Sequence, residues 1–214
     1  MTQVVADPAD PAFDRPDKPV GPHYTEAELE VLAARAGAVL AARPPEDLTI
    51  DGVRYRRAGA TWRRVVASPV PLEVVELPAV QALLAAGVVP VCAGGGGAPV
   101  ARRGAALEGL EAVIDKDRTA ALLTRSLHAD ALLILTDVDR VVLGFGTHDA
   151  RPLDRLTVPE ARRLLADGTF PSGSMGPKVA AAVAVAEAGR TAVITSLDRA
   201  GDALAGSAGT HVVA

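Results

Sequence analysis

From Val65 onward, short runs of β-branched residues alternate with helical segments rich in alanine and leucine, which restricts the possible folds. Apolar strands separated by helices are typical of a parallel sheet covered on both faces. The pattern predicts an α/β fold, a three-layer α/β/α sandwich with a mainly parallel sheet. The expected strands are Val65–Ala67, Val88–Cys92, Leu132–Thr136, Thr191–Thr195 and His211–Val213. The expected helices are Leu77–Ala86, Thr119–Leu127, Val158–Ala166, Gly176–Ala188 and Arg199–Ala205.

The residues before Val65 have a different composition and local pattern. Five prolines between residues 7 and 22 exclude an α-helix there and favour extended or turn structure. Thr25 and Glu28 form a capping-box pattern that predicts a helix over Thr25–Leu40. Asp51-Gly52 is a candidate hairpin turn. We therefore expect two parts, a smaller one over residues 1–64 and an α/β lobe over residues 65–214.

Charge and composition exclude several classes of protein. The formal net charge is −4, which argues against binding to a nucleic acid backbone, although arginines cluster beside Tyr55 and Trp62. A lone cysteine, Cys92, excludes a scaffold held by internal disulfides. No signal peptide or membrane-spanning run is visible, so we expect a cytoplasmic protein with no membrane partner. No metal-ligand spacing is present among His23, His128, His148 and His211.

Four consecutive glycines, Gly94, Gly95, Gly96 and Gly97, follow the expected strand Val88–Cys92. Ligands in α/β domains bind at the carboxyl ends of the strands. Glycines allow unusual dihedral angles and a close backbone approach to a ligand, and their amides can bind an anion. A flexible loop is the alternative. We favour a ligand contact over packing, although the loop matches neither the Walker nor the dinucleotide pattern.

Lysine is rare in this chain, with three lysines among 22 basic residues. Lysine supplies a compact point charge, whereas arginine supplies a planar fork, so these positions are candidates for a role that arginine cannot fill. Lys116 lies between Asp115 and Asp117, which can hold its ammonium group or cap the following helix. Both interpretations can hold together.

Lys178 lies at the start of an expected helix, where the helix dipole does not favour a cation. It follows the glycine-rich stretch Ser172-Gly-Ser-Met-Gly-Pro, and such backbone at a helix start favours anions. Ser174, Met175 and Gly176 of this stretch are therefore candidates to contact an anion. In Thr136-Asp137-Val138, at the end of another strand, the two polar side chains could bind ribose or phosphate hydroxyls or form a common turn. Two lysines beside ligand-binding loops predict a site that neutralises a charged phosphoryl group.

Seven segments in this order resemble carbamate kinase, a family within the amino acid kinase superfamily. They are Asp7-Pro-Ala-Asp-Pro-Ala-Phe with Pro16-Asp-Lys-Pro-Val-Gly-Pro, Arg63-Arg-Val-Val-Ala-Ser-Pro-Val-Pro, Ala93-Gly-Gly-Gly-Gly-Ala-Pro-Val, Gly109-Leu-Glu-Ala-Val-Ile-Asp-Lys-Asp, Leu133-Ile-Leu-Thr-Asp-Val-Asp, Gly173-Ser-Met-Gly-Pro-Lys-Val and Gly206-Ser-Ala-Gly-Thr-His-Val. The resemblance implies reversible phosphoryl transfer between ATP and carbamate in arginine catabolism, with Mg²⁺ arriving on ATP, and a homodimer.

The resemblance also implies a role for each candidate residue. Lys116 and Asp117 would lie at the reaction centre, and Lys178 would contact nucleotide phosphates. Lys18 would reach in from a protruding subdomain. The glycine loop, with Asp115 nearby, would lie close to the transferring phosphoryl group, and the stretch from Thr136 would line the nucleotide pocket.

The chain departs from the family pattern in its first part. Family members carry an earlier strand and a Gly-Gly-Asn loop that nothing here matches, and Asp17 and Ala67 replace a usual threonine and proline. A misassigned start codon and a truncated gene are both open interpretations. The alternatives to an active carbamate kinase are a catalytically impaired nucleotide-binding remnant and another amino acid kinase.

Overall fold

The computed structural model describes residues 2–40, 45–170 and 174–214. The chain divides into two compact units. The first comprises Met1–Val5, Pro71–Ala98 and Ile114–Ala214, and the second comprises Ala6–Val70 and Pro99–Val113. This division differs from the expected single boundary after residue 64, because the chain leaves the first unit and returns to it. None of the helices in the described ranges is both long and apolar enough to cross a bilayer.

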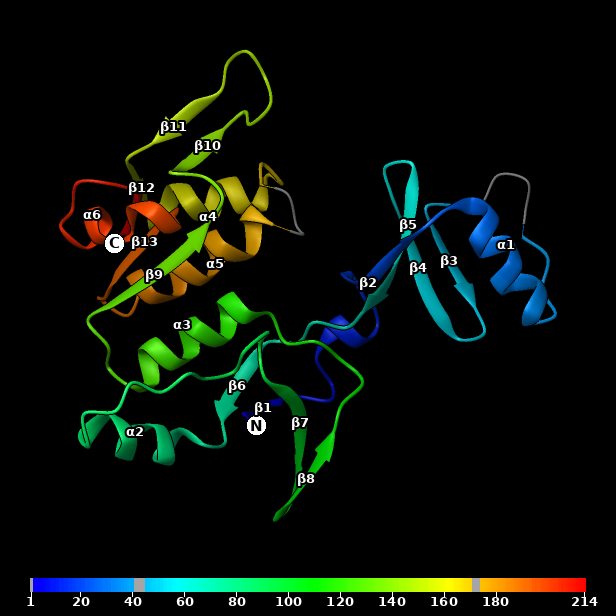
Figure 1. Cartoon of the computed structure of the whole chain (residues 1–214), viewed down its shortest axis with the longest axis horizontal. Helices are drawn as coiled ribbons and strands as arrows, with labels where there is room; N and C mark the ends of the chain where they lie inside the picture. Colours follow the sequence, from blue (N-terminus) through cyan, green and yellow to red (C-terminus); the bar gives the residue numbers. More distant parts are fainter. Residues whose placement is uncertain (1, 41–44, 171–173) are drawn as a thin grey trace. The chain divides into compact units, whose positions relative to one another are not determined.

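The first unit is built on a four-stranded sheet with the order β12-β14-β13-β9 (Figure 1). These strands are Arg155–Thr157, Thr210–Val213, Thr191–Ser196 and Ala131–Thr136, respectively. β9 and β13 run parallel, as do β12 and β14, whereas β13 and β14 are antiparallel. The sheet is therefore mainly parallel, as the sequence predicts.

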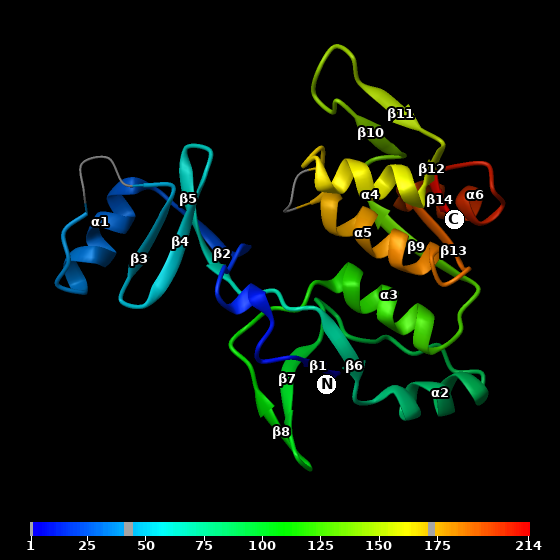
Figure 2. The ribbon, with the colours of Figure 1, turned by 180° about the vertical axis from the view of Figure 1, so that it is seen from behind.

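Side chains from both faces of this sheet are buried. Successive residues of β13 point to opposite faces, and residues 192–195 are all buried. Ala192 and Ile194 belong to the main core together with α4 (Val158–Ala166) and α5 (Met175–Ala186), which lie side by side in Figure 2. Val193 lies outside that core, and α6 (Ala200–Leu204) contacts β9 and β13. Cover on both faces is what the continuous apolar strands predict.

The remaining elements of the first unit position its loops. They are β1 (Gln3–Ala6, whose last residue belongs to the second unit), β6 (Pro71–Val74), α2 (Leu77–Ala85), α3 (Lys116–Ser126), β10 (Val141–Leu143), β11 (Arg151–Leu153), η2 (Leu197–Arg199) and α6 (Ala200–Leu204). All five expected helices of this lobe are present, with ends shifted by up to three residues. α3 begins earlier than expected because Asp115 caps it.

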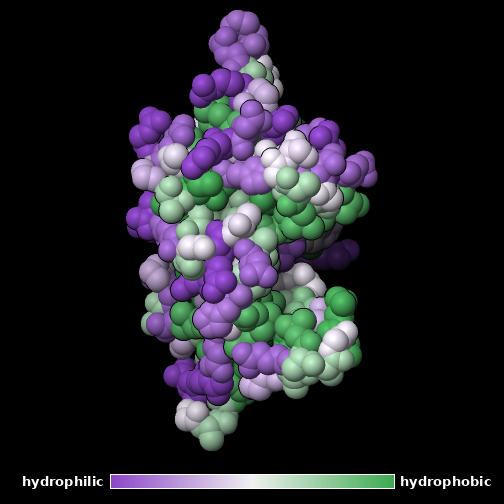
Figure 3. Space-filling model, turned by 90° about the vertical axis from the view of Figure 1, so that its left-hand side faces the viewer, coloured by the Kyte–Doolittle hydropathy of each residue, from purple (hydrophilic) through white to green (hydrophobic). Residues whose placement is uncertain are grey.

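The strand expected over Val88–Cys92 is absent from the described sheets, so that prediction was wrong. Val89 and Val91 are 87% and 97% exposed. A β-branched run becomes a strand only where a neighbouring strand pairs with it and covers its side chains. No described strand does so here. Apolar side chains reach the surface on the face shown in Figure 3. Leu83 and Leu84 of α2 are also exposed.

The second unit contains an antiparallel sheet with the order β2-β5-β4-β3, which packs against α1 around the buried side chains of Leu29 and Trp62. Its elements are η1 (Pro11–Phe13), β2 (Lys18–Tyr24), α1 (Glu26–Arg35), β3 (Asp47–Ile50), β4 (Val53–Ala58), β5 (Thr61–Val66), β7 (Ala98–Arg103, whose first residue belongs to the first unit) and β8 (Ala106–Gly109). Asp51 and Gly52, at φ values of 50° and 74°, join β3 to β4 and confirm the predicted hairpin turn. The Arg57 guanidinium lies 4.5 Å from the Trp62 ring centroid, which gives an intramolecular role to one arginine beside an aromatic residue.

The predicted capping box at the start of α1 is confirmed. The Glu28 amide donates to Thr25 Oγ1 at 3.3 Å, and the Thr25 amide donates to the Glu28 carboxylate at 2.7 Å. The Thr25 amide and then its hydroxyl lower the pKa of Glu28 below its ordinary value of 4.5. The helix itself ends at Arg35 rather than Leu40, before Gly37 at a φ of 72°.

We predict that α1 loses stability in acid. Because the pKa of Glu28 is lowered by folding, its stabilising effect is complete above pH 4.5 and is lost as the pH falls through the lower folded-state value. Amide hydrogen exchange in α1, corrected for intrinsic rates, should accelerate across that window. Glu28→Gln should flatten the response, while Glu30→Gln on the same helix should preserve it. An identical acid response in all three proteins would contradict the prediction.

Candidate functional site

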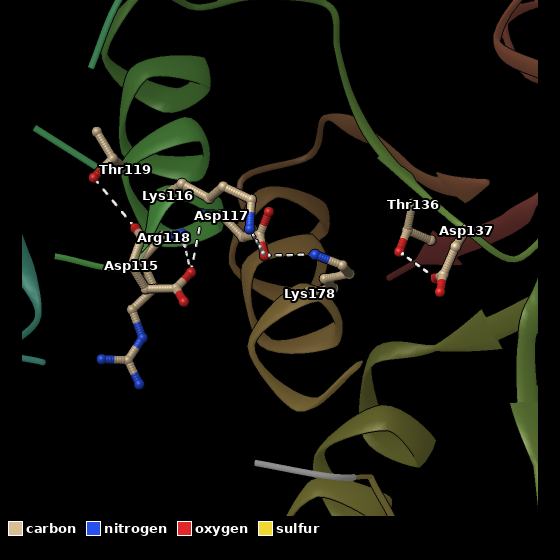
Figure 4. A network of polar contacts seen from close by, with 8 residues as sticks. All are labelled: Asp115, Lys116, Asp117, Arg118, Thr119, Thr136, Asp137 and Lys178. Carbon is tan, nitrogen blue, oxygen red and sulfur yellow. Dashed lines mark hydrogen bonds and ion pairs between the residues drawn. The ribbon is translucent and has the colours of Figure 1, made fainter. Parts of the chain in front are cut away.

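Charged residues of the first unit gather where α3 and α5 begin (Figure 4). The buried Asp115 is the N-cap of α3, since its Oδ1 accepts hydrogen bonds from the amides of Asp117 at 2.9 Å and Arg118 at 3.4 Å. This confirms the capping interpretation of that aspartate. The cap fixes the first turn of α3, and with it the backbone of Lys116 and Asp117.

Asp117 lies between two lysines from different helices. Lys178 Nζ of α5 donates to Asp117 Oδ2 at 3.0 Å, and Lys116 Nζ lies 3.9 Å from the same oxygen (Figure 4). The side chains of Asp117 and Lys178 are only 10% and 12% exposed, whereas that of Lys116 is 59% exposed. A buried charge is costly unless it is paired, so Asp117 holds the Lys178 ammonium in place. Lys116 remains accessible to a ligand.

The geometry of this group explains why lysine serves here. Two ammonium groups share the Asp117 carboxylate, which can neutralise only one of them. The first-turn amides of a helix also attract anions. A compact ammonium can approach both a carboxylate and a phosphate oxygen, whereas a guanidinium needs a wider, planar site. The arrangement is therefore suited to a multiply charged anion.

A cavity of about 370 Å³ extends from Lys178. It is lined by the end of β9, the β10–β11 hairpin and the start of α5, through Thr136, Asp137, Val138, Arg140, Val142, Gly144, Phe145, Thr169, Phe170, Ser174, Met175 and Lys178. Thr136 Oγ1 donates to Asp137 Oδ1 at 3.0 Å. Apolar side chains at one part of the lining and a cation at another suit a flat heteroaromatic group that carries phosphates.

The structure brings most of the candidate nucleotide-binding residues to this cavity. Five of them line it, in two groups far apart in the sequence: Thr136, Asp137, Val138, Ser174 and Met175. Gly176 is buried in the first turn of α5 and is not part of the lining. Residues 172 and 173 of the same motif lie outside the described residues.

Sequence reasoning missed the contribution of the β10–β11 hairpin and of the residues before α5. Val142, Phe145 and Phe170 line the cavity, yet none was a candidate. Aromatic residues make up 3% of the chain, so a phenylalanine outside the expected helices and strands was a usable signal. Their convergence depends on tertiary packing.

The four glycines of the loop differ in how closely other atoms approach them. A Cβ on Gly96 would lie 1.9 Å from the Ile114 carbonyl oxygen, and one on Gly97 would lie 2.4 Å from Val4 Cγ2. These two glycines are therefore required by contacts within the chain, which corrects the prediction that the run does not serve packing. A Cβ on Gly94 or Gly95 would meet no atom within 4 Å.

The loop is tied to the start of α3. Thr119 Oγ1 donates to the Gly96 carbonyl oxygen at 2.8 Å, so the loop lies against the turn that carries Lys116. Lys18, the remaining candidate, begins β2 in the second unit, and its role stays a prediction. In the described part of the chain, no three His, Cys, Asp or Glu side chains form a group that could hold a metal ion.

Comparisons with known proteins agree with this geometry. Residues 25–196 match the model of the amino acid kinase family. A carbamate kinase of Thermococcus kodakarensis is 44% identical over 214 residues, which cover 100% of this chain and 64% of that protein. A carbamate kinase-like protein of Escherichia coli is 44% identical and is also covered over 64% of its length. The solved structure of a Giardia lamblia carbamate kinase bound to AMP-PNP matches with a TM-score of 0.79 and 41% identity, covering 99% of this chain and 63% of that one. The chain thus spans about 64% of the length of these curated relatives.

Proposed function

Because the chain belongs to the amino acid kinase family, we propose that it catalyses reversible phosphoryl transfer between ATP and carbamate, giving ADP and carbamoyl phosphate. One observation carries the proposal: the buried Asp117 carboxylate holds Lys178 beside a 370 Å³ cavity and has Lys116 on its other side. The relatives named carbamate kinase support the choice of acceptor.

Phosphoryl transfer to carbamate needs little covalent chemistry from the protein. A carbamate oxygen is already anionic, so it can displace ADP from the γ-phosphorus without a base that removes a proton: the new O–P bond forms as the bond to ADP breaks. The barrier then depends on positioning and on positive charge around the transferring group. Lys178 would hold nucleotide phosphates, and Lys116 would neutralise charge on the transferring phosphoryl group. Asp117 positions both ammonium groups.

The cavity fits the donor nucleotide. Phe145, Phe170 and Met175 offer apolar surface for a base, and Lys178 lies on the same lining to meet phosphates. The Gly94 amide donates to the Cys92 carbonyl oxygen at 2.8 Å, so of the two open glycines Gly95 is the one whose amide would face the transferring group. We propose that Mg²⁺ enters on the nucleotide phosphates. We also propose that the protein acts in the cytoplasm, at the ATP-forming end of arginine breakdown. A homodimer is the proposed oligomeric state, and light scattering would test it.

The direct test is ATP formation by the purified chain supplied with ADP, MgCl₂ and carbamoyl phosphate. We expect ATP to accumulate in proportion to enzyme, and acetyl phosphate to be a poorer donor. ADP binding measured by calorimetry serves as the control. If ADP binds but no ATP forms from carbamoyl phosphate, the chain as given is a nucleotide-binding protein and not a kinase. Turnover with a different acyl phosphate alone would assign it to another acceptor.

A further inference from the structure

The β10–β11 hairpin contributes to the cavity but has little internal support. It forms a separate two-stranded sheet, with Val141 opposite Leu153, Val142 opposite Pro152 and Leu143 opposite Arg151. A two-stranded hairpin is marginally stable by itself in water. Since Val142 and Phe145 line the cavity, the hairpin must be held in place from outside.

One hydroxyl group bridges the two strands where the hairpin begins and ends. Thr210 Oγ1 accepts a hydrogen bond from the Val141 amide at 2.8 Å and donates one to the Leu153 carbonyl oxygen at 2.5 Å. Thr210 is 0% exposed and is the first residue of β14, in the main sheet. The hydroxyl therefore satisfies one donor and one acceptor at the paired root of the hairpin and connects them to the core.

Other contacts also hold the root of the hairpin. The His211 amide donates to the Asp154 carbonyl oxygen at 2.9 Å, and the Arg140–Asp154 ion pair, at 2.5 Å, involves an Asp154 side chain that is 84% exposed. An exposed ion pair contributes little because solvent screens it.

Val141 and Leu153 also pack in the main core, and the buried Thr195 hydroxyl donates to the Asp139 carbonyl oxygen at 3.3 Å, two residues before β10. Thr210 differs from these contacts because its hydroxyl hydrogen-bonds to the backbone of both strands of the hairpin.

We propose that Thr210 is a positioning residue for nucleotide binding: its hydroxyl fixes the root of the β10–β11 hairpin and so places Val142 and Phe145 against the bound nucleotide. Thr210 is not part of the cavity lining, so it acts through the hairpin rather than by touching the ligand. The inference rests on the proposed nucleotide site and adds a residue to it.

The test is Thr210→Val, which keeps the shape of the side chain and removes both hydrogen bonds. Two buried backbone groups lose their partner, and such a loss favours opening of the hairpin root. We expect faster amide exchange across residues 141–153 and a Kd for MgADP about tenfold higher by calorimetry, equivalent to about 1.4 kcal/mol. kcat at saturating nucleotide should change by less than about twofold, because the lysines near the reacting group are untouched.

Two further variants separate positioning from general stability. Thr210→Ser keeps the hydroxyl and should restore the Kd and the hairpin exchange rates to near wild type. Thr124→Val is the matched control: this buried threonine donates only within α3, to the Ala120 carbonyl oxygen at 2.8 Å. It removes a buried threonine hydroxyl away from the hairpin and should leave the MgADP Kd and the hairpin exchange unchanged.

Several results would overturn the inference. If amide exchange in the hairpin is unchanged in Thr210→Val, the Thr210 hydroxyl does not clamp the hairpin root, whatever the MgADP affinity of the variant. If Thr124→Val raises the MgADP Kd as much as Thr210→Val does, the effect is not specific to Thr210. If Thr210→Val does not fold, the wild-type protein gives the answer: the Val141 amide should exchange as slowly as those of β13, and exchange as fast as at Gly146 contradicts the clamp. Failure of the wild type to bind MgADP would refute the proposed function, while hairpin exchange would still judge the clamp.

Discussion

Replacing Lys178 with methionine is expected to lower kcat for ATP formation by about 10²–10³-fold, the usual cost of removing one group that stabilises transition-state charge. Methionine keeps much of the length of the side chain and its packing but carries no charge. Lys178 is nearly buried, its ammonium lies 3.0 Å from Asp117, and it lines the cavity, so its charge is held at a fixed place there. Steady-state kinetics with ADP and carbamoyl phosphate measure the effect.

The variant Lys178→Arg tests whether position 178 needs only a positive charge or also the compact shape of an ammonium group. If a compact ammonium is needed, arginine should recover less than about a tenth of wild-type kcat although it keeps the charge, because its planar fork does not fit a site that is 12% exposed. Arg162→Lys, a cation exchange in an exposed ion pair with Glu187, is the control and should leave kcat unchanged. Full turnover by Lys178→Arg would refute the argument that these positions require lysine.

Replacing Gly96 with alanine is expected to destabilise the first unit by about 3 kcal/mol, the upper end of the usual cost of overpacking. The added Cβ would lie 1.9 Å from the Ile114 carbonyl oxygen and 2.8 Å from its carbon, both backbone atoms, and the φ of 138° is itself unfavourable for alanine. The start of α3 or the loop must move, which also displaces Lys116. Thermal unfolding should report a Tm lower by roughly 6 °C or more.

The neighbouring Gly95 is the matched control for stability. A Cβ there would meet nothing within 4 Å, and its φ is not in the positive range. Gly95→Ala should therefore unfold at the wild-type temperature or slightly above it, since alanine restricts the unfolded chain. Equal loss of stability in the two variants would mean that the run of glycines acts through general flexibility, and the close approach to Ile114 would lose its significance.

Much of the fold follows from local patterns in the sequence. The capping box of Thr25 and Glu28, the turn at Asp51-Gly52 and the helix Val158–Ala166 are all where the pattern predicts them. Each of these depends on residues within a few positions of one another, so its energy is set locally. Val88–Cys92 failed because strand formation depends on a partner that local sequence does not specify.

Some residues of the candidate site could likewise be predicted from the sequence, whereas others required the structure. Rarity of lysine and the glycine run made Lys116, Lys178 and the loop candidates, because these residue types have properties that few others share. The roles of the two lysines stay predictions. The cavity-lining Phe145 and Phe170 were not identified, since only packing brings the hairpin and the start of α5 together. Gly96 needed the structure as well, because its constraint comes from a carbonyl oxygen 18 positions away along the chain.

The sequence by itself determined the α/β class, the order of its helices, the capping of α1 and the residue types at the site. Tertiary structure decided which charges meet and which buried groups are satisfied. Asp117 and Lys178 are 61 positions apart and form one ion pair only because α3 packs against α5. Likewise, the Thr210 hydroxyl bridges two backbone groups 57 and 69 positions away. Such contacts depend on the whole core, because a buried charge or hydroxyl is stable only where distant parts of the chain provide its partners.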